Sequence, residues 1–350
     1  MTDAVRERCE LLVNNRAAIR KGFLLEKELM SVAAGVIFTT AGKTADVGAM
    51  KACRKLLNKH SRPLSNLRDI VELALISKMA LAPSPEKYLD DFLSVYKKVQ
   101  QGKLLENDFM VLSSILILDL GLQDGCDEII SKANELTKRM KKDHPILTST
   151  DDASFITFLA ISNKSVDQIL ADLEEGYEYL TKTCKARVNA DPAYELCEVL
   201  AVSYGDMKEK CDKVMRIFNA MMKRDAEYGS GSAFSSLGAF IDVDAEPETV
   251  ANEIVEAELC LKDMKGFGGM SMDRRTRVMF ASLIVAGVYG KNLEAAGNSV
   301  IANTLALVWA KQIASMISTA TSVASSVVPA VLQAGDTGTG DAGTEETKTE

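Results

Sequence analysis

The sequence has little of what β-sheets and disulfide frameworks require. Stretches in which Val, Ile or Thr alternate with polar residues are few, so β-strands have little support. Aromatic residues make up only 6% of the chain, and there are only seven prolines. The seven cysteines form no CxxC pair, and their number is odd, which argues against a set of paired disulfides. We therefore expect a helical protein from a reducing compartment.

Histidine is also scarce, because His60 and His144 are the only two. The spacing typical of zinc ligands is absent, as are the GxSxG, HExxH, kinase and deaminase patterns. The sequence therefore predicts no cofactor and no metal. The N-terminal segment has no apolar core ahead of its charges, so it is not a signal peptide, and we expect a cytoplasmic protein.

The formal net charge is −8. The last fifteen residues, 336–350, carry five carboxylates against one lysine, so the body of the chain is only mildly acidic. A general nucleic-acid binder more often has a basic balance. We therefore expect no nucleic-acid partner.

Residues 190–230 contain the pattern of two helices joined by a break. Asp191 and Pro192 are typical of a helix start, and Gly205 followed by Asp206 is typical of one helix ending and another beginning. In the second helix, apolar residues recur at helical spacing: Cys211, Val214, Ile217, Phe218 and Met221. A helix pair this short cannot bury its apolar face alone, so it needs neighbours.

Similar second helices recur at steps of about 39 to 41 residues. They begin near Asp46, Pro85, Asp124, Ser165, Asp206 and Pro247. A large side chain falls at nearly constant spacing in the later units, as a buried contact between helices requires: Tyr96, Leu136, Tyr177, Phe218 and Leu259. We expect an all-α fold in which antiparallel helix pairs of about 40 residues stack into an α-solenoid or α-α superhelix.

The composition changes near residue 295. We expect residues 1–294 to form the helical repeat domain and residues 295–334, rich in Ala and Ser with Lys311 as their single charge, to form a helix that caps the array. A membrane contact through 295–335 is the alternative, which the dense Ser and Thr and the central lysine disfavour. Residues 335–350 lack large apolar side chains, so we expect them to be disordered.

Two segments hold the polar residues from which a ligand site could be built. The first is a loop with His144, Thr148, Asp151 and Asp152, which could hold a metal or transfer a proton. The alternative interpretation is a loop histidine followed by residues that cap the next helix.

The second segment begins with Lys265 and a glycine-rich turn, and three arginines open the next helix: Arg274, Arg275 and Arg277. The turn lacks the GxxxxGK[ST] pattern of a phosphate loop, and its glycines are also typical of a tight turn between helices. An anion could bind there because the backbone N–H groups at a helix start point outward. Lys265, Arg274 and Arg277 are the candidate ligand-binding residues.

These segments, taken in order, resemble a known family. The residues that carry the resemblance are Cys9–Val13 with Lys21–Phe23, the loop 144–149 with Asp151 and Asp152, the loop 265–269 and the Ala/Ser-rich end. Together they resemble a bacterial family known only as domain-of-unknown-function family four thousand and three. The resemblance spans nearly the whole chain and implies a bacterial, cytoplasmic protein, but no activity.

The expected function is that of a non-catalytic scaffold that binds a protein or peptide of unknown identity on the concave face of the array. The alternative is an enzyme, or a protein that binds a small anion or a metal, through the His144 loop and the Lys265–Arg277 region. A broad polar groove would favour the scaffold. A deep pocket joining His144 to Asp151 or Asp152 would favour chemistry.

Overall fold

The computed structural model describes residues 1–60, 71–102, 107–143, 153–183, 190–225, 228, 234–268 and 271–295. In this part of the chain all regular structure is helical, which confirms the predicted all-α class. The predicted cap and the predicted tail, beyond Ala295, lie outside the described residues.

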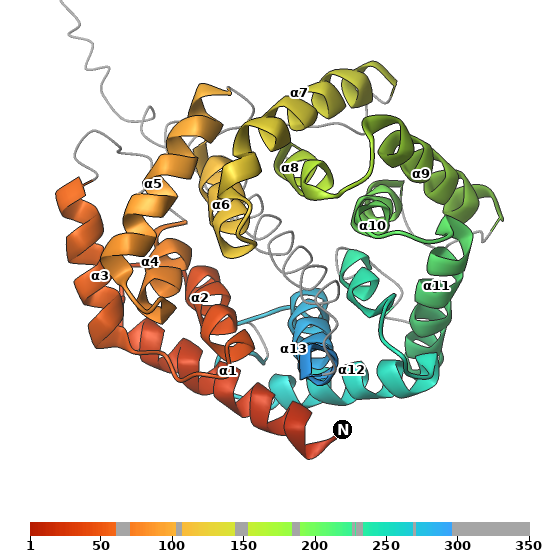
Figure 1. The fold of residues 1–350 in the computed structure, drawn as a ribbon. Helices are drawn as coiled ribbons and strands as arrows, with labels where there is room; N and C mark the ends of the chain where they lie inside the picture. Colours follow the sequence, from red (N-terminus) through yellow and green to blue (C-terminus); the bar gives the residue numbers. More distant parts are fainter. Residues whose placement is uncertain are drawn as a thin grey trace, which may run out of the picture.

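The helices form two concentric layers (Figure 1). The outer layer consists of α1 (Asp3–Gly22), α3 (Val47–His60), α5 (Pro85–Gln101), α7 (Cys126–Asp143), α9 (Val166–Glu178), α11 (Met207–Arg224) and α12 (Pro247–Lys262). The inner layer consists of α2 (Glu28–Thr40), α4 (Glu72–Leu81), α6 (Asn107–Asp119), α8 (Ala153–Ile161), α10 (Ala190–Val202), the 3-10 helix η5 (Ser235–Phe240) and α13 (Arg274–Ala295). Each outer helix is followed in the chain by an inner one.

The predicted second helices correspond to α3, α5, α7, α9, α11 and α12, and each begins within two residues of the predicted start. In α3, α5, α9 and α11, a side chain just before the helix accepts from one of its first N–H groups. Asp206 Oδ1 accepts from the Glu209 N–H at 3.0 Å, and Ser165 forms a reciprocal capping box with Gln168. At the preceding turn, Gly205 has φ +107°, a conformation that favours glycine where one helix ends.

The array closes into a ring, a feature that the sequence analysis did not predict. Each outer helix contacts the next one around the layer, and α12 contacts α1, so the outer layer forms a complete cycle. The last inner helix, α13, also packs against α1. Closure brings together segments about 250 residues apart, and no local pattern in a sequence encodes such a contact.

Arg16 of α1 holds the closure. Its side chain is buried, it forms an ion pair with Glu28, and Nη1 donates to the Lys265 carbonyl oxygen at 3.3 Å. The guanidinium also lies 5.9 Å from the centre of the Phe267 ring. Gly266 has φ +88°, and a Cβ there would overlap the Arg16 guanidinium. The turn after α12 therefore requires glycine for both its backbone angle and its contact with α1.

The two layers differ in how they are buried. Inner helices are buried on nearly every side; in α2, every residue from Met30 to Thr39 is buried. Outer helices bury one stripe, which in α5 consists of Leu89, Phe92, Val95, Tyr96 and Val99. The contrast follows from position, because an inner helix packs against its outer partner and its neighbours, whereas an outer helix keeps one face in water.

The predicted series of core residues is correct at three of its five positions. Tyr96, Leu136 and Phe218 are buried, whereas Tyr177 is half-buried and Leu259 is 42% exposed. The buried positions in α9 and α12 lie one residue earlier, at Gly176 and Glu258. The series of large side chains missed these two positions because a glycine and an ion-paired carboxylate are buried there.

No helix in the described part of the chain is both long enough and apolar enough to cross a membrane.

Phe218→Ala is expected to lower the free energy of unfolding by about 3–5 kcal/mol. The Phe218 ring is buried and meets Phe234 edge-on, with centroids 4.9 Å apart. Leu259→Ala is the control, and it should change stability by less than about 1 kcal/mol because the side chain is half in water. Urea unfolding measures both, and equal losses would contradict this assignment of the core.

Candidate functional site: buried lysines beside an open groove

The structure describes only part of the residues predicted to bind a ligand. His144, Thr148, Asp151 and Asp152 lie outside the described residues. Their loop joins α7 to α8, and Figure 1 shows these two helices on the opposite side of the ring from α12 and α13.

Arg277 is buried and bonded within the protein. Its Nε lies 2.7 Å from Glu258 Oε1, and Nη1 donates to the carbonyl oxygens of Phe267 at 3.2 Å and Met272 at 2.5 Å. Glu258 has no exposed surface, and the Tyr228 hydroxyl donates to its other oxygen at 3.0 Å. Burial and Glu258 raise the pKa of Tyr228, so the hydroxyl keeps its proton. This cluster fixes the turn between α12 and α13.

Arg274 also forms contacts within the protein, whereas the side chain of Lys265 is exposed to water. Arg274 Nη1 lies 2.8 Å from Asp225 Oδ2, and its guanidinium stacks 5.2 Å from the centre of the Tyr228 ring. The Lys265 side chain is exposed, and so is that of Arg275. The first turn of α13 therefore directs two of its three arginines into contacts with carboxylates of the fold.

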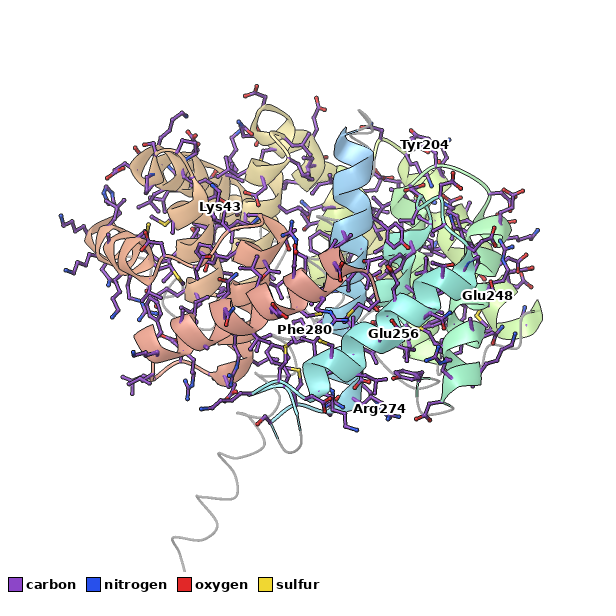
Figure 2. The ribbon with its side chains drawn as sticks, turned by 90° about the horizontal axis from the view of Figure 1, so that it is seen from below. Lys43, Tyr204, Glu248, Glu256, Arg274 and Phe280 are labelled. Carbon is purple, nitrogen blue, oxygen red and sulfur yellow. The ribbon has the colours of Figure 1, made fainter. Side chains whose placement is uncertain are left out.

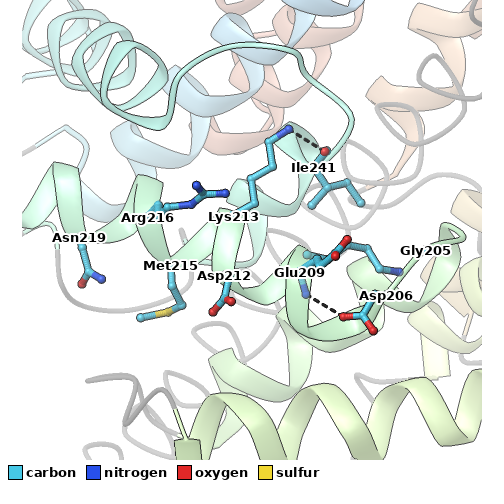
Figure 3. A pocket seen from close by; sticks show the side chains of 10 residues that line it. Gly205, Asp206, Glu209, Asp212, Lys213, Met215, Arg216, Asn219 and Ile241 are labelled. Carbon is cyan, nitrogen blue, oxygen red and sulfur yellow. Dashed lines mark hydrogen bonds between the residues drawn. The ribbon is translucent and has the colours of Figure 1, made fainter.

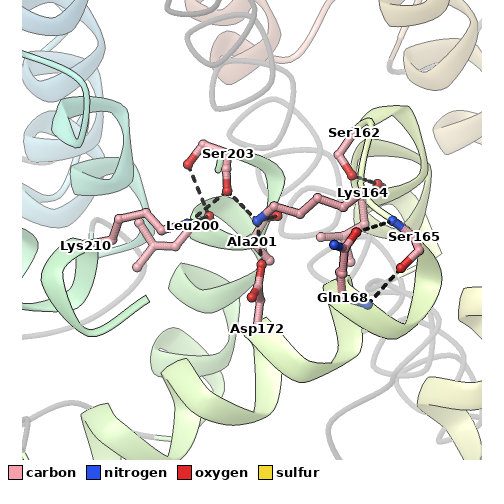
Figure 4. A network of polar contacts seen from close by, with 10 residues as sticks. Ser162, Lys164, Ser165, Gln168, Asp172, Leu200, Ala201, Ser203 and Lys210 are labelled. Atoms are coloured by element: carbon pink, nitrogen blue, oxygen red, sulfur yellow. Dashed lines mark hydrogen bonds and ion pairs between the residues drawn. The ribbon is translucent and has the colours of Figure 1, made fainter. Parts of the chain in front are cut away.

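A second polar cluster, which the sequence analysis missed, lies where α10 ends (Figure 4). Lys164 is 5% exposed; its ammonium pairs with Asp172, and it donates to the carbonyl oxygens of Ala201 at 2.9 Å and of Ser203. Lys210 is 8% exposed, and it donates to the carbonyl oxygens of Leu200 at 2.8 Å and Ser203 at 2.9 Å. The last carbonyls of a helix have no partner within it, and here two lysines supply the donors.

Burial changes the proton affinity of this cluster. Desolvation, reinforced by the charge of Lys164, lowers the pKa of Lys210 to about 8. Lys213, one turn further along α11, donates to the carbonyl oxygens of Ile241 at 2.8 Å and Val243 at 2.6 Å, and burial lowers its pKa as well. Burial raises the pKa of Asp242, against the opposing effect of Lys213 and Lys210. Perturbed groups gathered in this way favour a functional site.

An open groove lies beside these lysines along α11 (Figure 3). Its volume is about 790 Å³, and charged side chains of both signs line it along the helix: Asp206, Glu209, Lys210, Asp212, Lys213 and Arg216. The side chain of Met215 also lines it, and Ile241 contributes from beyond η5. The described residues include no group of three or more His, Cys, Asp or Glu side chains placed to hold a metal ion.

Comparison with family models gives one match that covers most of the chain. Residues 17–314 match the model described as a protein of unknown function, DUF4003. The chain belongs to this family. The match confirms the resemblance noted in the sequence. Searches of curated proteins and of solved structures gave no match, so the DUF4003 assignment brings no activity with it.

Arg277→Met is expected to lower the free energy of unfolding by about 3–5 kcal/mol, because Glu258 would remain buried without its cation. Arg275→Met, two residues earlier on an exposed side chain, should change stability by no more than about 0.5 kcal/mol. Thermal and urea unfolding measure both variants. If the two variants lose the same stability, the buried ion pair does not hold the turn.

Lys210 should make the stability of the protein depend on pH. Its pKa falls from 10.5 to about 8 on folding, so between these values the unfolded chain holds more protons. The free energy of unfolding therefore rises with pH across this range. The contribution of Lys210 is complete above pH 10.5 and is lost as the pH falls towards 8. Compared with Lys210→Met, the wild type should gain up to about 3 kcal/mol between pH ~7 and pH ~10.5.

Urea unfolding at the two pH values tests this expectation. Lys87→Met, which removes an exposed lysine of α5, serves as the control and should show no such difference. An identical pH dependence for Lys210→Met and the wild type would show that the amine keeps an ordinary pKa in the fold.

Proposed function

We propose that the protein is a non-catalytic helical scaffold that binds a segment of another protein in the groove along α11. The observation that carries the proposal is the groove itself, which is open, about 790 Å³ in volume, and lined by charges of both signs. Small-molecule sites are usually enclosed and mostly apolar. An open groove with charged walls suits a polypeptide better.

The concave face, which the sequence analysis favoured, offers less to a partner. The inner helices are buried on nearly every side, and few of their described residues are exposed away from the helix ends. In the outer layer, by contrast, Glu209, Asp212, Arg216 and Asn219 are exposed along one helix. This contrast supports placing the binding surface on the outside of the ring.

The order of the charges suggests the chemistry of the partner. The amines of Lys210 and Lys213 donate to backbone carbonyls of the fold, so the exposed charges of the groove are acidic at Asp206, Glu209 and Asp212 and basic further along α11, at Arg216. A segment with basic residues at one end and acidic residues at the other would complement it. Such complementarity fixes orientation and excludes wrong partners.

The buried lysines give this groove a stable wall. Lys164 and Lys210 both donate to the Ser203 carbonyl, and so join the end of α10 to α9 and α11. A rigid surface loses less conformational freedom on binding, which favours affinity. In this role the lowered pKa of Lys210 follows from its burial and requires no catalytic step.

A photo-crosslinking amino acid at Asn219 tests the proposal in the cells that make the protein. One partner should be captured there and not from Gln100, an exposed outer residue of α5. Arg216→Glu should reduce the product at least about tenfold, because like charges in contact cost several kcal/mol. Lys97→Glu, on α5, should leave it unchanged. Equal capture at Gln100, or a product insensitive to Arg216→Glu, would contradict the proposal.

A further inference from the structure

The most exposed large apolar side chains of the described residues lie together in one turn. Leu25 is fully exposed and Leu24 is 69% exposed, in the connection from α1 to α2. Exposed leucines are unusual next to each other, because the hydrophobic effect favours burying each of them. A pair presented side by side is typical of a surface that meets an apolar phase or a partner.

The fold holds this turn in place. Phe23 is buried, and the Arg54 guanidinium of α3 lies 4.7 Å from the centre of its ring. Arg20 Nη1 donates to the carbonyl oxygens of Leu24 at 2.9 Å and Glu26 at 2.5 Å. Side chains of α1 and α3 therefore hold the backbone that carries Leu24 and Leu25.

The surroundings of the leucines are basic. The exposed cations there are Lys21 and Lys27 in the same segment and Lys265 in the turn after α12, which Arg16 ties to Glu28 at the start of α2. The two carboxylates of the connection itself are paired, because Glu26 lies 2.7 Å from Arg54 and Glu28 contacts Arg16. Lys21 and Lys265 therefore add positive charge beside the leucines that these two carboxylates do not neutralise.

The position of the turn on the ring extends this basic surface. The turn follows the end of α1 and precedes the start of α2, and the turn after α12, which leads to α13, lies beside it through Arg16. Figure 2 shows Arg274, at the start of α13, on the edge opposite Tyr204, which follows α10. Outer helices carry basic residues in their last turns, at the end of the ring where Arg274 lies. These residues include Lys59, Lys141, Lys142, Lys223 and Lys262.

We propose that this face docks on a membrane surface that contains anionic lipid, with Leu24 and Leu25 inserted among the headgroups. Two apolar side chains give an attachment that reaches the acyl boundary, and cations around them attract anionic headgroups. A nucleic acid would match the cations but would leave the two leucines without a role. A lipid surface accounts for both.

Flotation of the full-length protein with vesicles tests the proposal. It should bind vesicles of phosphatidylcholine with about a third phosphatidylglycerol, bind phosphatidylcholine alone far less, and dissociate as salt rises. Leu24→Ser with Leu25→Ser should lower partitioning at least about tenfold. Lys21→Glu with Lys265→Glu should lower it by a similar factor. All four side chains are exposed, and circular dichroism confirms that each variant is folded.

The matched controls lie at the other end of the ring. Tyr204→Ser removes a side chain that is 66% exposed, and Lys43→Glu reverses an exposed cation after α2. Both should bind vesicles as the wild type does. Absence of binding to the anionic vesicles would overturn the proposal, as would loss of binding in the controls. Binding that needs the lysines but not the leucines, or a dimer that forms through the leucines without vesicle binding, would also overturn it.

Discussion

The contact of α1 with α12 and α13 determines the shape of this molecule. Without it, the helix pairs would form an open array with an exposed apolar face at each end. Closure buries both ends against each other, and the buried cation Arg16 takes part directly by joining α1, α2 and the turn after α12. The Glu258–Arg277 pair then holds that turn from the other side. Two buried arginines thus fix the turn that meets α1 at the closure.

A second regularity runs around the ring, at the ends of the inner helices. A cation of the preceding outer helix donates to the last carbonyls in three pairs: Arg8 to Thr39, Lys132 to Ser162 and Lys213 to Ile241. In the α9–α10 pair, Asp172 stands 40 residues after Lys132 and 41 residues before Lys213. It binds Lys164, which supplies the donor instead. This substitution places two lysines at one helix end, where burial lowers the pKa of Lys210 and the charge of Lys164 lowers it further.

The sequence was a good guide to the local structure and a poor guide to the sites. Capping residues such as Ser165 and Asp206 act on their immediate neighbours, so the helix starts could be predicted. The role of Arg277 could not, because its partner Glu258 looks like an ordinary surface carboxylate of an amphipathic helix. The roles of Lys164 and Lys210 could not be predicted either. Burial of a lysine depends on the packing of three helices and cannot be seen in the composition or the residue spacing. The one sequence feature that pointed to this cluster was the short connection between helices at residues 162–165, in an otherwise regular series of helix pairs.

Closure of the ring is the claim on which the rest depends, and a distance between α1 and α12 tests it most directly. Spin labels carried by unnatural amino acids at Glu10 and Leu259, both exposed, leave the native cysteines intact. Helices in contact have axes about 8–10 Å apart, so double electron–electron resonance should give one short, narrow distance distribution. An open array would separate the two labels by the width of the whole stack of pairs, on the order of 60 Å. A distribution centred there would contradict the closed ring.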